Sequence, residues 1–142
     1  MLDLVTQFPA DPCAVLCQIE DILALAAENT RPFASLASLT LTLPQTLSPA
    51  SWSIAFRSLT ARSPLAEFYL YTIGEHLPGS HDLSGFVDSV LDLHAVTLRK
   101  FSFHRLRLQP AVVGTICASC PSLETLFVVV ESSHLVRLTI TF

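Results

Sequence analysis

The chain has 142 residues, of which 51% are hydrophobic and 14% are charged, and its formal net charge is −4. Every apolar run stops well short of the roughly 20 residues that a membrane-spanning helix needs, so the sequence argues against such a span. The negative net charge argues against general affinity for nucleic acid. The amino terminus lacks the basic segment and apolar block of a secretion signal, so we predict an intracellular protein, cytoplasmic or nuclear.

The first predicted elements lie near the amino terminus. Leu2-Asp3-Leu4 has the form of a partial strand. Asp11-Pro12 is typical of a helix start, with Asp as N-cap and Pro at the first helical position. Apolar residues then follow at helical spacing and predict one buried stripe, made of Val15, Leu16, Ile19, Ile22, Leu23 and Ala26.

Four later segments share the pattern L-x-x-[LF]-x-[LFV]. They begin at Leu36, Leu65, Leu98 and Leu123, and successive starts are 29, 33 and 25 residues apart. The alternation of apolar residues is typical of a strand with one buried face. The spacings lie in or somewhat above the range of about 20–29 residues found in leucine-rich repeats.

A helix is predicted after each of the first three of these strands. Ser48-Pro49, Asp82 and Gln109-Pro110 mark the three starts. The expected inward residues are Trp52, Ala55, Phe56 and Leu59 in the first helix, Leu83, Phe86, Val87, Val90 and Leu91 in the second, and Val112, Val113, Ile116 and Cys117 in the third. Residues 72–81 contain glycine and proline and predict an exposed loop.

The carboxyl terminus departs from this repeat. Val136, Leu138, Ile140 and Phe142 alternate as in a strand. The connection from the preceding strand is too short for a helical crossover, so we predict a hairpin turn at residues 131–134 and a final antiparallel strand.

The order of elements predicts an α/β fold, and the repeated spacing predicts a leucine-rich-repeat solenoid. Residues 1–142 would form a single array of about four to five irregular units, with a mostly parallel curved sheet and helices on its outer face. Because neither end carries a polar capping repeat, self-association through the array ends is a further expectation.

The stretch Ile116-Cys117-Ala118-Ser119-Cys120-Pro121-Ser122-Leu123-Glu124-Thr125-Leu126 resembles leucine-rich-repeat proteins of the F-box class, especially the divergent fungal ones. That family commonly ends a helix with Cys-Pro and begins the next strand with L-x-x-L. The resemblance implies a protein partner bound on the concave sheet face, such as a substrate presented to a ubiquitin ligase. No F-box helix cluster precedes the repeats, so a truncated repeat fragment without independent function is an alternative.

The outward strand positions predict where such a partner would bind. They form the rows Ser38, Thr40, Thr42; Glu67, Tyr69, Tyr71; Lys100, Ser102, His104; and Thr125, Phe127, Val129. Tyrosine is favoured at protein interfaces, and exposed apolar residues often mark one. The predicted partner-binding residues are Glu67, Tyr69, Tyr71, Lys100, Ser102, His104, Thr125 and Phe127. The alternative is an ordinary solvated face, with Phe127 and Val129 covered by the last strand.

Four basic residues cluster at Arg99, Lys100, Arg105 and Arg107. Such a cluster is compatible with an acidic partner or a phosphate group. We favour a solvated strand edge, because no aromatic residues are interleaved with these charges in a pattern known from RNA-binding proteins.

The cysteines form two closely spaced pairs, Cys13 with Cys17 and Cys117 with Cys120, whose spacing is compatible with zinc. In an array these pairs would lie on different repeats and far apart. Cys13 and Cys17 are also one helical turn apart, as buried helix residues would be. The other pair lies at a helix end, where the dipole does not activate a thiol. We therefore expect neither a metal site nor a redox pair.

Alternating strands and helices also permit a small α/β enzyme or a nucleotide-binding domain. The chain has four glycines and contains neither G-x-G-x-x-G nor G-x-x-x-x-G-K-[ST]. The best acid–base candidates are His76 and His81 with Glu75 and Asp82, all in or beside the predicted loop. We expect no catalytic residue and no cofactor, and hence a protein that is not an enzyme.

Overall fold

The computed structural model describes residues 14–18, 24, 33–43, 49–72, 83–130 and 136–141. Its elements, in chain order, are β1 (Ala14–Gln18), β2 (Ser38–Leu43), α2 (Pro49–Thr60), β3 (Glu67–Thr72), α3 (Ser84–His94), β4 (Lys100–Leu108), α4 (Pro110–Ser119), β5 (Thr125–Val130) and β6 (Val136–Thr141).

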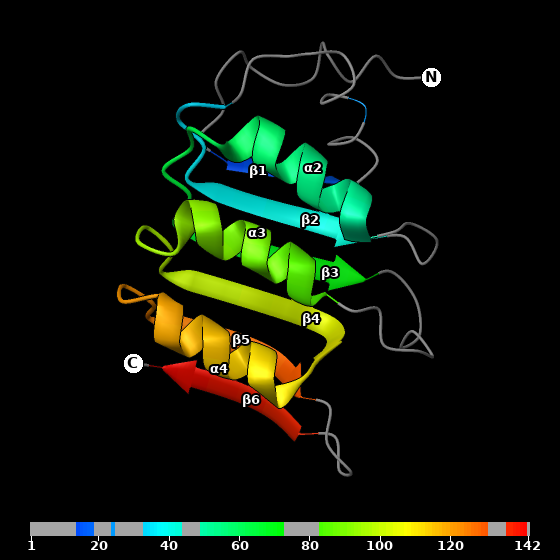
Figure 1. Ribbon diagram of the computed structural model, residues 1–142, viewed down its shortest axis with the longest axis vertical. Coiled ribbons are helices and arrows are strands. Elements are labelled where there is room, and N and C mark those ends of the chain that lie inside the picture. Colours follow the sequence, from blue (N-terminus) through cyan, green and yellow to red (C-terminus); the bar gives the residue numbers. More distant parts are fainter. Residues whose placement is uncertain are drawn as a thin grey trace.

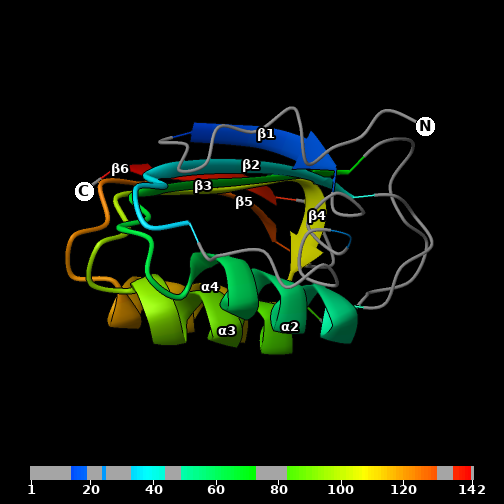
Figure 2. The same ribbon diagram turned by 90° about the horizontal axis from the view of Figure 1, so that it is seen from above.

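The strands form one sheet in the order of the sequence, from β1 to β6. The first five are parallel, and β6 pairs with β5 in the antiparallel direction. Helices α2, α3 and α4 lie side by side over one face of this sheet (Figures 1 and 2). The α/β class, the mostly parallel sheet and the final antiparallel strand are therefore confirmed, while the hairpin turn at 131–134 lies outside the described residues.

The helix predicted after Asp11-Pro12 is wrong over residues 14–18, which form strand β1. Val15 pairs with Leu39 and Cys17 with Leu41 in parallel register. A short apolar run fits a helix and a strand equally well by periodicity, and pairing with β2 decides between them here. Ile19, Ile22, Leu23 and Ala26 lie outside the described residues, as does the partial strand at Leu2–Leu4. In-register partners from β1 to β5 (Val15, Leu39, Phe68, Phe101, Leu126) are 24, 29, 33 and 25 residues apart.

The same backbone hydrogen bonds recur where strands begin. In three of the L-x-x-[LF]-x-[LFV] segments, the carbonyl oxygen of the residue after the first leucine accepts two hydrogen bonds. The donors are two backbone N–H groups at the start of the next strand. Ala37, Ala66 and Arg99 supply these oxygens, and the N···O distances are 2.7–3.0 Å. The same backbone atoms therefore fix the position of each strand relative to the next, so residues at equivalent positions lie side by side across the sheet.

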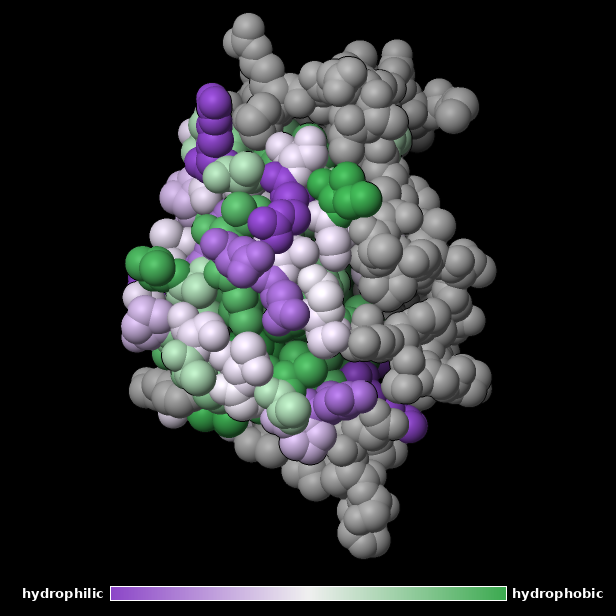
Figure 3. All heavy atoms as spheres, viewed as in Figure 1, coloured by the Kyte–Doolittle hydropathy of each residue, from purple (hydrophilic) through white to green (hydrophobic). Residues whose placement is uncertain are grey.

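The core between the two layers is centred on Phe68 of β3. Its ring lies 5.5 Å from Phe56 of α2, 6.0 Å from Phe86 of α3 and 5.5 Å from Phe101 of β4. All inward residues predicted for α2 and α3 are buried. The outer surface of these helices is mixed in hydropathy (Figure 3) and includes an ion pair of 3.0 Å between Arg57 and Asp92.

The helix starts follow the sequence with one difference. Helix α2 begins at Pro49, and α4 has Gln109 as N-cap and proline next to it, as predicted. The N-cap of α3 is Leu83 without a side-chain capping bond, and Asp82 lies outside the described residues.

The prediction for the inner face of α4 is wrong at Cys117, which is exposed. Ile116 is buried, and Val112 and Val113 pack against the core while remaining partly exposed. One residue advances about 100° round a helix, so Cys117 points away from the direction of Ile116.

One polar contact joins α2 and α3 inside the core. The Thr60 hydroxyl donates its proton to the carbonyl oxygen of Phe56 at 2.8 Å, so it accepts from Nε2 of His94, which is 3.0 Å away. Nδ1 of His94 is buried and has no hydrogen-bond partner among the described residues. Protonation there would bury a charge, and burial lowers the pKa of His94 to about 4.

We predict that Phe68→Ala lowers the free energy of unfolding by about 3–5 kcal/mol, because it leaves a cavity among three aromatic rings. Urea denaturation followed by circular dichroism measures the change. Ile54→Ala is the matched control, because Ile54 is 74% exposed and its removal should change stability by less than about 0.5 kcal/mol. Equal effects at the two positions would contradict this packing.

Stability is predicted to fall as the pH drops from about 6.5 to about 4, because the unfolded chain takes up a proton on His94 that the folded chain resists. The shift corresponds to a loss of up to about 3 kcal/mol. Urea titrations at several pH values test this, and His94→Leu should flatten the dependence in this window. If the stability of the variant depends on pH as strongly as that of the wild type, groups other than His94 cause the dependence.

Candidate binding face

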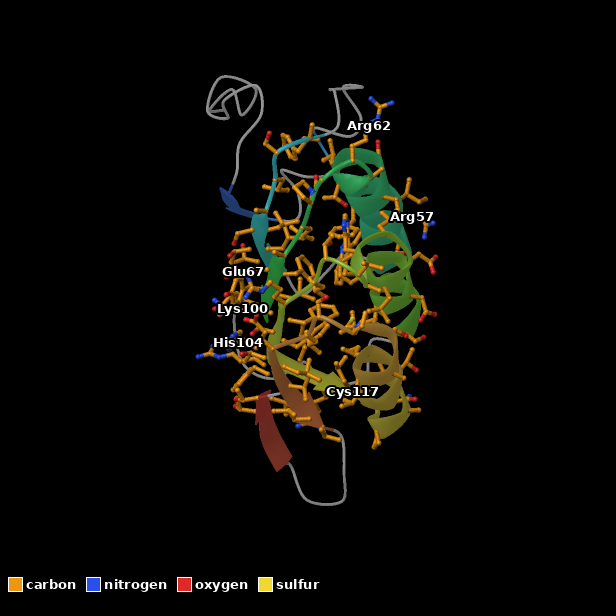
Figure 4. All side chains as sticks on the ribbon, turned by 90° about the vertical axis from the view of Figure 1, so that its left-hand side faces the viewer. Arg57, Arg62, Glu67, Lys100, His104 and Cys117 are labelled. Carbon is orange, nitrogen blue, oxygen red and sulfur yellow. The ribbon has the colours of Figure 1, made fainter. Side chains whose placement is uncertain are left out.

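The face of the sheet opposite the helices, here called the open face, carries the outward residues of β2 to β6. No helix or strand among the described residues lies over it (Figures 1 and 2). The register sets Lys100 between Glu67 and Thr125, Ser102 between Tyr69 and Phe127, and His104 beside Tyr71. Glu67, Lys100 and His104 project from the sheet away from the helices (Figure 4). All eight predicted residues thus lie together on one face.

A charged pair marks the start of the central strands. Lys100 Nζ donates to Glu67 Oε1 at 2.7 Å, and the Tyr69 hydroxyl donates to Glu67 Oε2 at 3.2 Å. The hydrogen bond from Lys100 lowers the pKa of Glu67 against the effect of burial. The same bond raises the pKa of Lys100, and burial raises the pKa of Tyr69. Glu67 therefore stays ionised and holds both neighbours in place.

Arg99 and Lys100 of the basic cluster are engaged in ion pairs. Arg99 pairs with Glu124, and Lys100 pairs with Glu67. Arg105 and Arg107 lie further along β4 and are exposed. Because β4 lies between β3 and β5, the predicted strand edge is wrong, although the side chains of Arg99 and Lys100 are 59% and 43% exposed and thus solvated.

Three rings form a stack across β3, β4 and β5. The ring of His104 lies 4.2 Å from Tyr71, with an interplanar angle of 1°, and 4.5 Å from Phe127, with an angle of 21°. Neighbouring strands are about 4.8 Å apart, so rings from adjacent strands stack at near-contact distance. Partial burial between its neighbours lowers the pKa of His104 and favours the neutral ring. The stack gives the open face a rigid aromatic ridge.

A bulge in β4 lies next to His104. Register runs from Ser102 opposite Phe127 to Arg107 opposite Val129, so β4 advances five residues while β5 advances two. Arg105 has φ of 62°, a conformation that is uncommon for residues other than glycine. Beyond the bulge β4 bends toward the helices (Figure 2).

This bulge was not predicted from the sequence, although a signal for it is present. Phe101 and Phe103 are buried before it, and Leu106 and Leu108 are buried after it. Buried positions therefore change from odd to even numbers within one strand. The three extra residues of β4 reverse the alternation, as any odd number would, and bulges commonly occur beside functional sites.

Two outward residues contribute little surface. Ser102 is 6% exposed between the rows of Tyr69 and Phe127, and Val129 is 5% exposed. The accessible part of the predicted face consequently centres on Glu67, Lys100 and the aromatic stack.

Among the described cysteines, Cys17 is not brought together with Cys117 and Cys120. Cys117 is exposed on α4, and Cys120 is buried with its pKa raised to about 11, chiefly by burial, which keeps its thiol protonated. Cys17 lies in β1, at the other edge of the sheet from α4 (Figure 1). Within the described ranges, no three His, Cys, Asp or Glu side chains gather as metal ligands would. Cys13, Glu75, His76, His81 and Asp82 lie outside those ranges.

Comparisons with protein-family models, curated proteins and solved structures found no match. None of the helices in the described part of the chain has the length and apolar character needed to cross a bilayer. The function must therefore be inferred from the geometry of the molecule itself.

Lys100→Met is predicted to raise the pKa of Glu67, because the variant removes the hydrogen bond that lowers it and leaves the burial that raises it. Carboxyl-detected NMR titration measures the shift. Arg99→Met is the matched control, since Arg99 pairs with Glu124 and should leave Glu67 unchanged. An unshifted Glu67 in the Lys100 variant would mean that the pair does not form in solution.

Proposed function

We propose that this chain is a leucine-rich-repeat solenoid that recognises a protein partner through the open face of its sheet. The repeat is supported by equivalent atoms in successive units. Four leading leucines (Leu36, Leu65, Leu98 and Leu123) are buried, and three of the residues after them accept the paired backbone hydrogen bonds. Arrays of this type use an extended sheet face for binding.

The observation that carries the binding proposal is the aromatic stack of Tyr71, His104 and Phe127. Aromatic rings held rigidly on a surface lose little conformational entropy when a partner binds, and they dominate the energetics of many interfaces. The bulge at Arg105 lies directly beside this stack and reshapes the strand that holds His104. A positive φ in a non-glycine residue costs about 1–3 kcal/mol and is often retained for function.

The ion pair of Glu67 and Lys100, which lies on the same face as the aromatic stack, would orient a bound partner. Glu67 and Lys100 are 34% and 43% exposed, so a partner can contact both without separating them. Because charged pairs at an interface favour complementary partners over others, this pair would restrict the register in which a partner docks.

The resemblance of residues 116–126 to the F-box class extends the proposal to a partner class. In this extension the bound protein is a substrate handed to a ubiquitin ligase inside the cell. Recovery of a ligase adaptor together with the chain would support the extension, and its consistent absence from otherwise specific complexes would remove the extension while leaving the binding face intact.

We predict that Tyr71→Ala with Phe127→Ala weakens partner binding at least tenfold, the loss typical of an interface hot spot. The full-length chain and this variant are used as bait in quantitative affinity capture, and a retained protein is purified and its Kd is measured directly. Ile54→Ala removes an exposed apolar side chain on the helix side, away from the open face, and serves as control. Partners that bind all three chains equally would refute recognition through the open face.

A further inference from the structure

The bulge in β4 changes the side to which two arginines project. Phe101 and Phe103 are buried, so a strand of regular alternation would turn Arg105 and Arg107 toward the core as well. The bulge reverses the alternation, so that Leu106 is buried and both arginines are exposed. Removing a guanidinium group from water without a partner is strongly unfavourable. The bulge therefore keeps two positive charges on the surface of a strand that lies within the sheet.

The position of Arg107 on the open face follows from strand pairing. Arg107 is directly opposite Val129 of β5, and register partners on neighbouring strands project to the same side of a sheet. Val129 alternates with the core residue Val128, so it projects away from the helices. Arg105 is exposed, has φ of 62° and directly follows His104 of the aromatic stack. Two arginines thus adjoin the stack at the carboxyl end of β4.

The charge of these strands is opposite in sign to the charge of the whole chain. Strands β2 to β5 contain one acidic residue, Glu67, and three basic residues, Lys100, Arg105 and Arg107. Glu67 and Lys100 form an ion pair with each other. Burial lowers the pKa of His104 and favours its neutral form, so the positive surplus comes from the two arginines. In a chain of net charge −4, this local surplus favours an acidic ligand.

We propose that the open face binds an extended protein segment rich in glutamate and aspartate. Its carboxylates meet Arg105 and Arg107, and an apolar or aromatic side chain of the segment packs against the stack of Tyr71, His104 and Phe127. This inference rests on the proposed function, because it names the chemistry of the segment that the open face would recognise. Guanidinium groups form strong paired hydrogen bonds with carboxylates, and aromatic rings supply contact area beside them.

The charge of the chain favours a protein segment over nucleic acid. A nucleic acid carries a phosphate at every step, and its affinity comes from many cations along the backbone. The net charge of −4 opposes such a ligand, whereas two arginines beside an aromatic stack suit a short segment in which acidic and apolar residues lie close together.

Fluorescence anisotropy with the full chain tests this inference. The probe is a short labelled peptide in which glutamate and phenylalanine alternate, and its neutral control has glutamine in place of glutamate. The glutamate peptide should bind about tenfold more tightly at low salt, and added salt should reduce the difference. The variant with Arg105→Gln and Arg107→Gln should bind the two peptides equally, because the charges that distinguish them are gone.

The matched control is Arg57→Gln with Arg62→Gln, which removes the same charge from the helix side of the molecule (Figure 4). This variant should keep the preference for the glutamate peptide. Chemical shifts of backbone amides should change on β3, β4 and β5 when the peptide is added, and stay constant on α2 and α3. Circular dichroism verifies that each variant is folded.

The variant with Tyr71→Ala and Phe127→Ala separates this inference from the proposed function. It should weaken the binding of both peptides, and unchanged binding would count against the open face itself. Equal binding of both peptides by the wild type, with loss of both in this variant, would overturn the acidic preference and leave recognition through the open face intact. Failure of the glutamate peptide to bind, a preference that survives the loss of Arg105 and Arg107, or tighter binding of oligothymidylate would each overturn the inference.

Discussion

Pairing of parallel strands in register is the constraint on which both faces of the molecule depend. Leu39, Phe68, Phe101 and Leu126 are successive partners across the sheet, so they form one continuous buried row. Because side chains alternate along a strand, the same pairing sets the outward residues into rows. A shift of one residue would exchange the core with the open face. The recurring hydrogen bonds at the strand starts oppose such a shift, since they align equivalent atoms in each pair of strands.

The register between neighbouring strands is not kept along the whole length of β4, because a bulge interrupts it. Before it, β4 follows the common register, and after it the buried positions change parity and the strand bends toward the helices. The regular part holds Lys100 beside Glu67, and the irregular part begins where His104 stacks between two rings. The uncommon backbone conformation of Arg105 thus lies at the boundary between two parts of β4: the part before it follows the register of β3 and carries His104 in the aromatic stack, and the part after it bends toward the helices.

Much of the fold follows from the sequence, because apolar alternation and proline-started helices report local structure directly. The inward faces of α2 and α3 and the strand at β6 were predictable for this reason. Strand β1 was not, since Ala14–Gln18 is too short to separate the two periodicities and only its pairing with β2 decides. The eight face residues could be placed by alternation alone. Their contacts could not, because the ion pair of Lys100 and the stacking of His104 depend on which strands become neighbours.

Charged side chains are distributed unevenly over the two layers of the molecule. On the open face, the ion pair of Lys100 with Glu67 lies beside the aromatic stack, so polar and aromatic groups occur together there. Over the sheet, α2 and α3 share the ion pair of Arg57 and Asp92, whereas the stretch from Leu108 to Leu123, which contains α4, has no charged residue. The low charge content of the chain is therefore due in part to this one stretch, and the charges that remain on the sheet lie where the proposed partner would meet them.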